Sequence, residues 1–450
     1  MRETFIKVRP FEFIDILSYE GFQGINEHGT VKISGHIHAG DEEAYIQMLK
    51  QDVWADVFMT DESGNETVLF NGIVAEALIQ VRNHVKILSL ELKTGTWLMD
   101  QDLHIRTYQD SGLMYKEILQ SCLQRYPGGA MISTAGKGEQ TGRFICQYQE
   151  TDWEFFRRMA NRIHTVLVAN HTVQGTKLFL GFPQRSGQTE LLSNDYEVIR
   201  TNGTMCWKTE VRDVYKPGDT VMFLGNKLRI VQIHTRMEGS ELYHTCYLMA
   251  EKDIIAGAEY NPHVIGVSLN ATVLSVSRDT VCISVTDDEN KGKPGVCKFP
   301  YATVYSSSDG TGWYCMPEPG DSVRLYFPDE AEEHAYVISS SHLESSDGEE
   351  RCNPDYKSIM NAQGKEVLFR PDALIMTNNA GMSIELSDRE GIRISSNLPV
   401  IIRSEQAIDL SSVSSSVEIH APDSIVLEQN GTQMSLAGNV MMKGARVRLN

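Results

Sequence analysis

The stretch between residues 408 and 427 reads Ile408-Asp-Leu-Ser-Ser-Val-Ser-Ser-Ser-Val417-Glu-Ile-His-Ala-Pro-Asp-Ser-Ile425-Val-Leu427. Pairs of apolar residues spaced by two recur in it, and mostly polar residues fill the intervals. The same signature continues from about residue 384 to the end of the sequence, with pairs usually eight or nine residues apart and closer near the end. The pairs are Ile392/Ile394, Val400/Ile402, Ile408/Leu410, Val417/Ile419, Ile425/Leu427, Met434/Leu436, Val440/Met442 and Val447/Leu449.

Each pair indicates a short strand followed by a turn, because side chains two residues apart share one face of a strand. One such strand buries too little apolar surface to offset the entropy lost on ordering it. Three chains can turn these faces toward a shared axis and bury them together, as stacked repeats do. A monomeric parallel β-solenoid is the alternative, but eight or nine residues are too few for three faces. We therefore predict a trimeric β-helix or β-prism needle over 371–450, with these pairs as its core.

The rest of the chain reads as mainly β with inserted helices. Runs that alternate between apolar and polar residues, such as Val85-Lys-Ile-Leu-Ser-Leu-Glu-Leu92, are typical of strands in a barrel or sandwich. A chain of 450 residues is too long for one simple core, so we expect several domains. They are a first hub β-barrel at 1–105, a helical insertion at 106–165, a second hub β-barrel at 166–258, an OB-fold barrel at 263–345 and a linker at 346–370.

Two helices are expected in the insertion. The first spans roughly residues 111–126 and ends at a Pro-Gly-Gly sequence. The second opens at Thr151-Asp-Trp-Glu154, which has the spacing of a capping box. Its apolar stripe is Phe155, Met159 and Ile163. We predict that this stripe packs in the core and that the arginines of the helix point elsewhere.

Charge and cysteine usage narrow the function classes. The formal net charge of −19 argues against nucleic acid or an anionic membrane as the main partner. The eight cysteines lack zinc-ligand spacing, and we expect them to be reduced and mostly buried. The first ten residues show no signal peptide, and no apolar run approaches a membrane span. We therefore expect synthesis in the cytoplasm and no use of the general secretory route.

Catalytic and metal-binding patterns are weak. His36 and His38 share one face of a predicted strand, but no third ligand is evident, so we interpret them as exposed strand histidines. The acidic runs at 287–289 and 330–333 contain paired carboxylates of the kind that glycosidases use. They lie in predicted loops, and we interpret them as solvated charges. No common catalytic or nucleotide-binding motif is present. The sequence therefore predicts no enzyme, no metal site and no cofactor.

Three stretches resemble VgrG-type spike proteins, the hub and spike fusions of type VI secretion systems and contractile phage tails. Gln147-Tyr-Gln-Glu-Thr-Asp-Trp-Glu-Phe-Phe-Arg-Arg-Met159 is similar to the family's Y-x-E-T-D-W/F-x-F helix start. Thr94-Gly-Thr-Trp-Leu-Met-Asp100, followed by Thr107-Tyr108, resembles the segment that leads into the first helix. Residues 319–328 and 335–340 resemble the end of the family's OB domain. With the domain order and the C-terminal pairs, the resemblance covers nearly the whole chain.

The resemblance implies a homotrimer that closes the inner tube of a contractile injection system, with a collar of OB domains and a needle that punctures the target envelope. Its implied partners are further copies of itself, an Hcp-like tube protein, baseplate proteins, a PAAR-like tip protein and effectors, without nucleic acid. The interval at about 345–370 is too short for the lysozyme domain of some members, and the sequence stops directly after the last pair, so we expect a separate tip. The alternative functions are a cell-wall-degrading enzyme and a trimeric surface adhesin.

Overall fold

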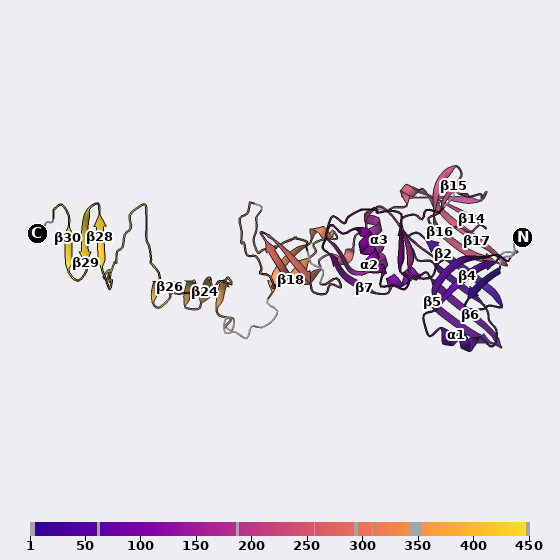
Figure 1. Cartoon of the computed structure of the whole chain (residues 1–450), viewed down its shortest axis with the longest axis horizontal. Helices are drawn as coiled ribbons and strands as arrows, with labels where there is room; N and C mark the ends of the chain where they lie inside the picture. The colour runs from indigo at the N-terminus through magenta and orange to yellow at the C-terminus, as the bar shows by residue number, and fades with distance from the viewer. Residues whose placement is uncertain are drawn as a thin grey trace. The chain divides into compact units, whose positions relative to one another are not determined.

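A computed structural model of the chain describes residues 5–60, 64–185, 189–255, 257–291, 296–307, 309–341 and 353–446. The chain divides into two compact units, Met1–Glu344 and Ser345–Asn450, and each is described by itself. Strands dominate both units, and short helices occur in the first (Figure 1). The fold is mainly β, as the alternating runs predict.

The largest element of the first unit is a twelve-stranded sheet. Its strands are β1 (Phe5–Arg9), β2 (Asp15–Gly24), β3 (Thr30–His36), β4 (Trp54–Thr60), β5 (Glu66–Arg82), β6 (Val85–Lys93), β12 (Thr189–Glu190), β13 (Tyr196–Thr201), β14 (Thr204–Val211), β15 (Thr220–Phe223), β16 (Asn226–Glu238) and β17 (Glu241–Met249). The hydrogen-bonded order is β1-β4-β5-β6-β3-β2-β16-β17-β14-β13, and β15 pairs with both β12 and β16. The β2–β16 pair, in which Gly24 lies opposite Gln232, joins the two predicted hub barrels into one continuous sheet.

A short helix, α1 (Glu42–Met48), lies in a range that we predicted to contain only strands. Glu42 and Glu43 occupy its first turn, where acidic side chains interact favourably with the helix dipole. The side chain of Tyr45 in this helix is buried, and the centre of its ring lies 5.2 Å from the centre of the Phe11 ring. Seven residues are too few to display a helical period, so the sequence pattern did not reveal this helix.

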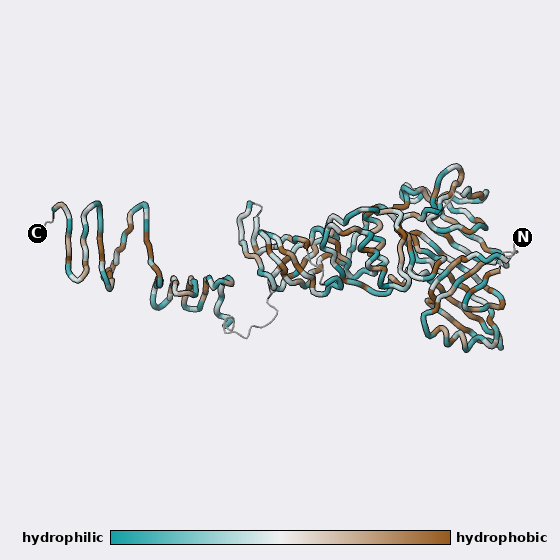
Figure 2. Tube along the Cα trace, viewed as in Figure 1, coloured by the Kyte–Doolittle hydropathy of each residue, from teal (hydrophilic) through white to brown (hydrophobic). Residues whose placement is uncertain are grey.

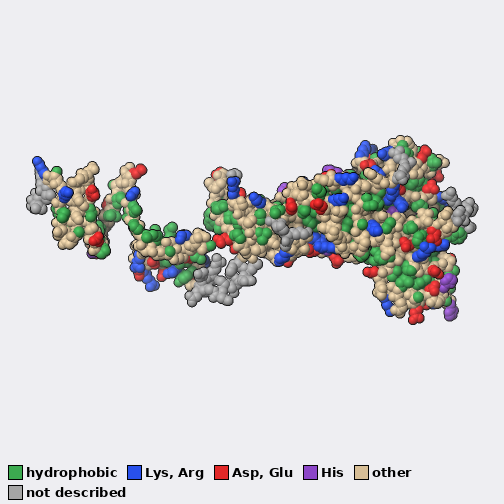
Figure 3. All heavy atoms as spheres, in the orientation of Figure 1, with side chains coloured by type: hydrophobic (Ala, Val, Ile, Leu, Met, Phe, Trp, Pro, Cys, Tyr) green, Lys and Arg blue, Asp and Glu red, His purple; other side chains and the backbone are tan. Residues whose placement is uncertain are grey.

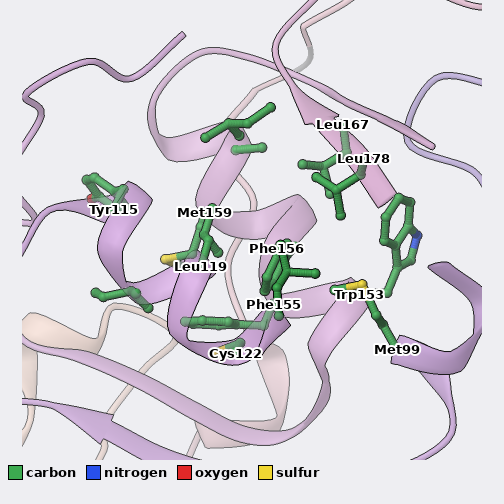
Figure 4. Packing of buried hydrophobic residues seen from close by; sticks show 14 of the residues in the cluster. Met99, Tyr115, Leu119, Cys122, Trp153, Phe155, Phe156, Met159, Leu167 and Leu178 are labelled. Carbon is green, nitrogen blue, oxygen red and sulfur yellow. The ribbon is translucent and has the colours of Figure 1, made fainter. Parts of the chain in front are cut away.

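A mixed layer of strands and helices follows. Its elements are η1 (Gly95–Asp100), β7 (Leu103–Tyr108), α2 (Tyr115–Leu123), β8 (Ala130–Ser133), β9 (Ile145–Thr151), α3 (Asp152–Arg162), β10 (Leu167–Ala169) and β11 (Lys177–Leu180). Strand β7 pairs with β9, and β10-β11-β8 form a small sheet. Leu119 of α2 and Phe155, Phe156 and Met159 of α3 point toward one another in its buried core (Figure 4). The predicted helical insertion therefore contains strands as well as both helices.

The two helices begin at different kinds of signal. Helix α2 starts at Tyr115, later than predicted, because Asp110 and Gly112 form a turn in which the Gly112 N–H donates to Asp110 Oδ1 at 2.8 Å. The capping box of α3 is confirmed. The Glu154 N–H donates to Thr151 Oγ1 at 3.1 Å, and the Thr151 N–H donates to Glu154 Oε2 at 2.9 Å.

The apolar stripe of α3 packs in the core, as predicted. Phe155 and Met159 are fully buried, and Ile163, just after the helix, is also buried. The prediction for the arginines is wrong at Arg158. Its side chain is buried, with the guanidinium 5.5 Å from the centre of the Phe155 ring and paired with the acidic partners described below. The helix is thus held by an apolar contact and by buried charge.

The first unit ends in a small barrel. Three short helices, η2 (Glu251–Asp253), η3 (Pro262–Val264) and η4 (Glu332–His334), lie before and within it. Its strands are β18 (Ser268–Ser277), β19 (Thr280–Val285), β20 (Phe299–Pro300), β21 (Ser322–Tyr326) and β22 (Tyr336–Ser341). Their order is β20-β19-β18-β21-β22, and a parallel bridge from Tyr301 to Val337 brings the two edge strands together. The assignment of this barrel to the OB type stays a prediction.

The strands of the second unit form two antiparallel sheets, β23–β27 and β28–β30, in which neighbours along the chain pair as hairpins. Its strands are β23 (Lys357–Met360), β24 (Glu366–Arg370), β25 (Ala373–Thr377), β26 (Met382–Ser387), β27 (Gly391–Ser396), β28 (Ile425–Gln429), β29 (Thr432–Leu436) and β30 (Val440–Lys443). Asn430 and Gly431 both have positive φ, at 33° and 85°, which is the conformation that a tight hairpin turn requires. We predicted a linker at 346–370, but β23 and β24 lie within that range, so the strands of this unit begin earlier than expected. Residues 346–352 lie outside the described residues.

Candidate assembly sites

The described part of the second unit has no core of its own. Among its described residues, 353–446, no residue is buried. Ile392, Val400 and Leu410 of the predicted needle core expose 73%, 60% and 71% of their surface in the single chain. Hydrophobic side chains accordingly lie open on the surface of this unit (Figure 3). Exposed apolar surface of this extent is typical of a contact surface.

Strands β28–β30 bring six predicted core residues onto one face. Cross-strand pairing forms two rows, and paired side chains in such rows contact each other. The rows are Ile425, Leu436 and Val440, and Leu427, Met434 and Met442. A hollow of about 370 Å³ lies among Leu427, Met434 and Met442. The spacing of two in the sequence thus becomes a continuous apolar face.

The apolar rows begin before residue 384, where the recurring pairs were predicted to start. Strands β23–β27 form one row of Ile359, Val367, Met376, Ile384 and Ile394, and a second of Phe369, Leu374, Leu386 and Ile392. Only Ile392 and Ile394 were predicted. The signal was present, since Val367/Phe369, Leu374/Met376 and Ile384/Leu386 have the same spacing of two. The set of apolar pairs therefore extends over both sheets of this unit.

The remaining predicted core residues are not in strands. Residues 397–424 are all described and form no strand in the single chain, and six of the predicted residues lie there. They are Val400, Ile402, Ile408, Leu410, Val417 and Ile419. Val447 and Leu449 lie outside the described residues. The role of the whole set as a trimer core stays a prediction.

A second candidate site is the seam between the helical layer and the barrel. Glu332 in η4 is buried there and accepts hydrogen bonds from Arg158 Nη1 at 2.8 Å and from Arg162 Nη2 at 2.5 Å. Arg158 also donates through Nε and Nη2 to the two carboxylate oxygens of Glu150, at 2.8 and 2.7 Å. This two-pronged geometry is the strongest form of an arginine–carboxylate pair.

A second barrel carboxylate enters the same seam. Glu289, which follows β19, accepts from Arg106 Nε at 2.9 Å and from Arg125 Nη1 at 2.7 Å, and its other oxygen lies 2.9 Å from His104 Nδ1. The buried Arg106 also donates to Asp152. Two loops of the barrel therefore attach to the helical layer through charged groups: Glu332 is fully buried, whereas Glu289 stays partly exposed and binds the buried Arg106.

The chain is similar in fold to known tail and secretion proteins. Residues 40–204 match the family model described as phage tail baseplate hub (GPD), and no curated protein sequence matches the chain. The chain is similar in structure to the E. coli c3393 protein, with 13% identity and a TM-score of 0.55, over 75% of this chain and 100% of that one. The c3393 protein is described as a component of the type VI secretion system that is structurally similar to the T4 bacteriophage tail proteins gp27 and gp5. A chain of the Francisella PdpA-VgrG complex has 9% identity and a TM-score of 0.60 over 88% of each chain. The chain has a VgrG-type fold. The matched family model describes a structural part of the tail baseplate rather than an enzyme.

In this VgrG-type fold, the acidic residues of the helix-start motif build the seam. Glu150 binds Arg158, and Asp152 binds Arg106. Thr151 between them caps α3. Both arginines therefore reach barrel carboxylates while they are held by the motif. The motif has a structural role at a domain junction, which explains why these residue types stand side by side.

The charges of the seam alter pKa values in opposite directions. Burial alone would raise the pKa of Glu289, but hydrogen bonds from Arg125 and His104 and the charge of Arg106 lower it to about 2. Burial dominates at Glu150 and raises its pKa, although Arg158 opposes the shift. Glu289 therefore carries its charge through the ordinary pH range.

The interpretation of the acidic runs as solvated loop charges is wrong for two residues. Asp288 is buried and accepts from the Thr107 N–H at 3.0 Å, and Glu332 is fully buried. Asp287 and Glu333 are partly or largely exposed, as expected. The partners of the buried pair lie far away in the sequence, so the local pattern of turn residues could not indicate them.

Other predicted features have mixed outcomes. His36 Nδ1 lies 2.7 Å from Asp15 Oδ1 at the end of β3, and His38 is exposed beyond the strand. In the part of the chain that the structure describes, no group of three or more His, Cys, Asp or Glu is placed to hold a metal ion, and no helix is long and apolar enough to cross a membrane.

Seven cysteines are free, but only Cys122, Cys146 and Cys246 of these are buried, so the expectation of mostly buried cysteines is wrong. Cys352 lies outside the described residues.

Proposed function

We propose that three copies of this chain form the central hub and spike of a contractile injection system. The first units form the hub that closes the inner tube, and the second units wind together into the needle. Contraction of the sheath drives the needle through the target envelope and carries effectors with it. The protein is made in the cytoplasm and leaves the cell as part of the expelled spike.

The observation that carries this proposal is the absence of buried residues among residues 353–446, although apolar residues recur along cross-strand rows there. A single sheet exposes both of its faces, and its apolar face needs a cover to offset the entropy of ordering the strands. Other copies of the same chain carry the same apolar rows and can cover this face with them. The VgrG-type fold of the chain supports a threefold arrangement over other covers.

The proposed partners follow from the same role. An Hcp-like tube protein would stack on the hub, baseplate proteins would surround it, and a PAAR-like tip protein would cover the open end of the needle. A strand edge that ends in solvent is a site for further pairing, so a cap protects it. Effectors are the proposed cargo.

Light scattering on the purified full chain at micromolar concentration tests the proposal. The expected mass is three times the 50.5 kDa of the chain. A stable, folded monomer at this concentration would overturn the argument from the uncovered apolar rows. A dimer would contradict the threefold axis while leaving the need for a cover intact.

A further inference from the structure

The chain between β20 and β21 forms an ordered hairpin, which we call the aromatic arm, residues 301–316. An antiparallel bridge joins Ser306 to Gly312, and the Trp313 N–H donates to the Tyr305 carbonyl at 2.8 Å. At its base the Tyr314 hydroxyl donates to the Arg278 carbonyl at 2.9 Å. Residue 308 lies outside the described residues. The arm is therefore held in a defined conformation by its own hydrogen bonds and by the barrel.

This arm presents large apolar side chains to solvent. Val304, Tyr305, Trp313 and Tyr314 expose 89%, 55%, 62% and 76% of their surface. Trp and Tyr are the residues that most often dominate the energy of protein interfaces, and a rigid hairpin loses little entropy when it binds. The arm is pale in Figure 2, because Ser, Thr, Gly, Tyr and Trp are neither strongly hydrophilic nor strongly hydrophobic.

The arm is also nearly free of charge. Asp309 is the only charged residue in 301–316, whereas 22% of the whole chain is charged. Each copy carries a net charge of −19, so copies of this chain repel one another unless they meet through surface that lacks acidic residues. A nearly uncharged aromatic surface on an acidic protein fits a contact with another copy of that protein.

Chain length limits how far apart the copies can lie. β22 ends at Ser341 and β23 begins at Lys357. A fully extended connection of this length spans at most about 55 Å at roughly 3.4 Å per residue. A needle made by three chains therefore keeps three barrels tethered near one another, whatever the path of the connection.

We propose that the aromatic arm of each copy docks on the barrel of a neighbouring copy, as a second contact that holds the trimer together apart from the needle. This inference rests on the threefold assembly proposed above. In a cyclic trimer such a contact joins two different surfaces, so that the three arms form a closed ring. The arm would then bury Trp313 and Tyr314 against the neighbour.

Photo-crosslinking of the full chain tests the arm directly. Benzoylphenylalanine replaces Tyr314 in chains that are mixed, unfolded and refolded as equal parts of ¹⁵N-labelled and unlabelled protein. We expect crosslinked peptides of mixed isotope composition that map to residues 263–341 of a second copy. Crosslinks confined to peptides of one isotope composition, in a sample that light scattering shows to be trimeric, would overturn the arm contact and leave the proposed function intact. A monomeric sample would overturn the trimer itself.

Subunit exchange supplies a second readout. Trp313→Ser combined with Tyr314→Ser should speed the exchange between labelled and unlabelled trimers at least tenfold, because two buried aromatic contacts per interface are lost. Tyr196→Ser, which removes an exposed tyrosine from β13, is the matched control and should change the rate less than twofold. An unchanged exchange rate in the arm variant would contradict the proposal, because the arm would then contribute nothing to the stability of the contact between copies.

Discussion

Glu332 illustrates what a single buried charge can do in this fold. Its carboxylate accepts hydrogen bonds from the guanidinium groups of Arg158 and Arg162 and from the Cys146 N–H at 3.1 Å. An ionised carboxylate is stable away from water only where such donors replace its hydration. Glu332 therefore joins the barrel to α3 as long as both arginines stay in place.

Replacing this carboxylate tests the seam at the residue scale. Glu332→Gln removes the negative charge and leaves Arg162 and part of Arg158 without their buried counter-ion. Breaking one partner of a buried ion pair typically costs about 3–5 kcal/mol, and we expect a loss of this size in the free energy of unfolding of the first unit. Urea unfolding followed by tryptophan fluorescence measures it, because Trp153 lies in the buried core of the same layer.

The neighbouring residue provides a matched control. Glu333 pairs with Arg143 at 2.6 Å, but both side chains are substantially exposed. Glu333→Gln makes the same change of charge one position along the chain and should cost less than about 1 kcal/mol. Equal losses in the two variants would show that the buried position of Glu332 contributes nothing special.

At the scale of elements, local signals were predictable and long-range partners were not. The capping box of α3 is contained in four residues, so its sequence pattern is sufficient. The site of Glu289 depends on Arg106 and Arg125, which are more than 160 positions away. Only the packing of the barrel against the helical layer brings these residues together. The sequence around each of them gives no sign of that contact.

The apolar rows of the second unit lie between these cases. The spacing of two in Ile425/Leu427 and Met434/Leu436 predicted that the residues share a face, and the cross-strand register confirms it. The same spacing at Val367/Phe369 shows that the rows could have been extended to β24 from the sequence. The spacing could not predict that residues 397–424 form no strand in one chain, because their pairing depends on what covers them.

A paired substitution tests the rows at the element scale. Ile408→Asp combined with Val417→Asp would place three carboxylates in each of two layers at the proposed axis. Burial of unpaired charge costs several kcal/mol per layer, so the trimer should melt at a clearly lower temperature or dissociate. Calorimetry and light scattering on the full chain measure the two effects.

The control for this pair lies between the two positions. Val413 is fully exposed, at 104%, and belongs to none of the predicted pairs. Val413→Asp adds the same charge to the same region and should leave the melting temperature of the trimer nearly unchanged. A variant at Ile408 and Val417 that melts like the Val413 variant would mean that the predicted rows face solvent.

At the scale of the whole molecule, the acidic composition and the proposed assembly act against each other. Three copies carry three times −19, a charge of −57, and its self-repulsion opposes their association. The apolar rows and the aromatic arm, whose one charged residue is Asp309, place the proposed contacts on side chains that carry no charge. The repulsion then acts at a distance, between outer surfaces, where dissolved ions screen it.

This arrangement predicts that salt stabilises the trimer. The screening length falls from about 30 Å at 0.01 M salt to about 10 Å at 0.1 M, so repulsion between the outer surfaces of the copies weakens over this range. The melting temperature of the trimer should therefore rise from 0.01 to 0.15 M sodium chloride, and subunit exchange should slow. Chloride is the suitable anion, because sulfate also strengthens apolar burial by exclusion from the surface. A trimer that dissociates as chloride is added would instead be held by exposed ion pairs between copies, which would contradict the assignment of its contacts to uncharged surfaces.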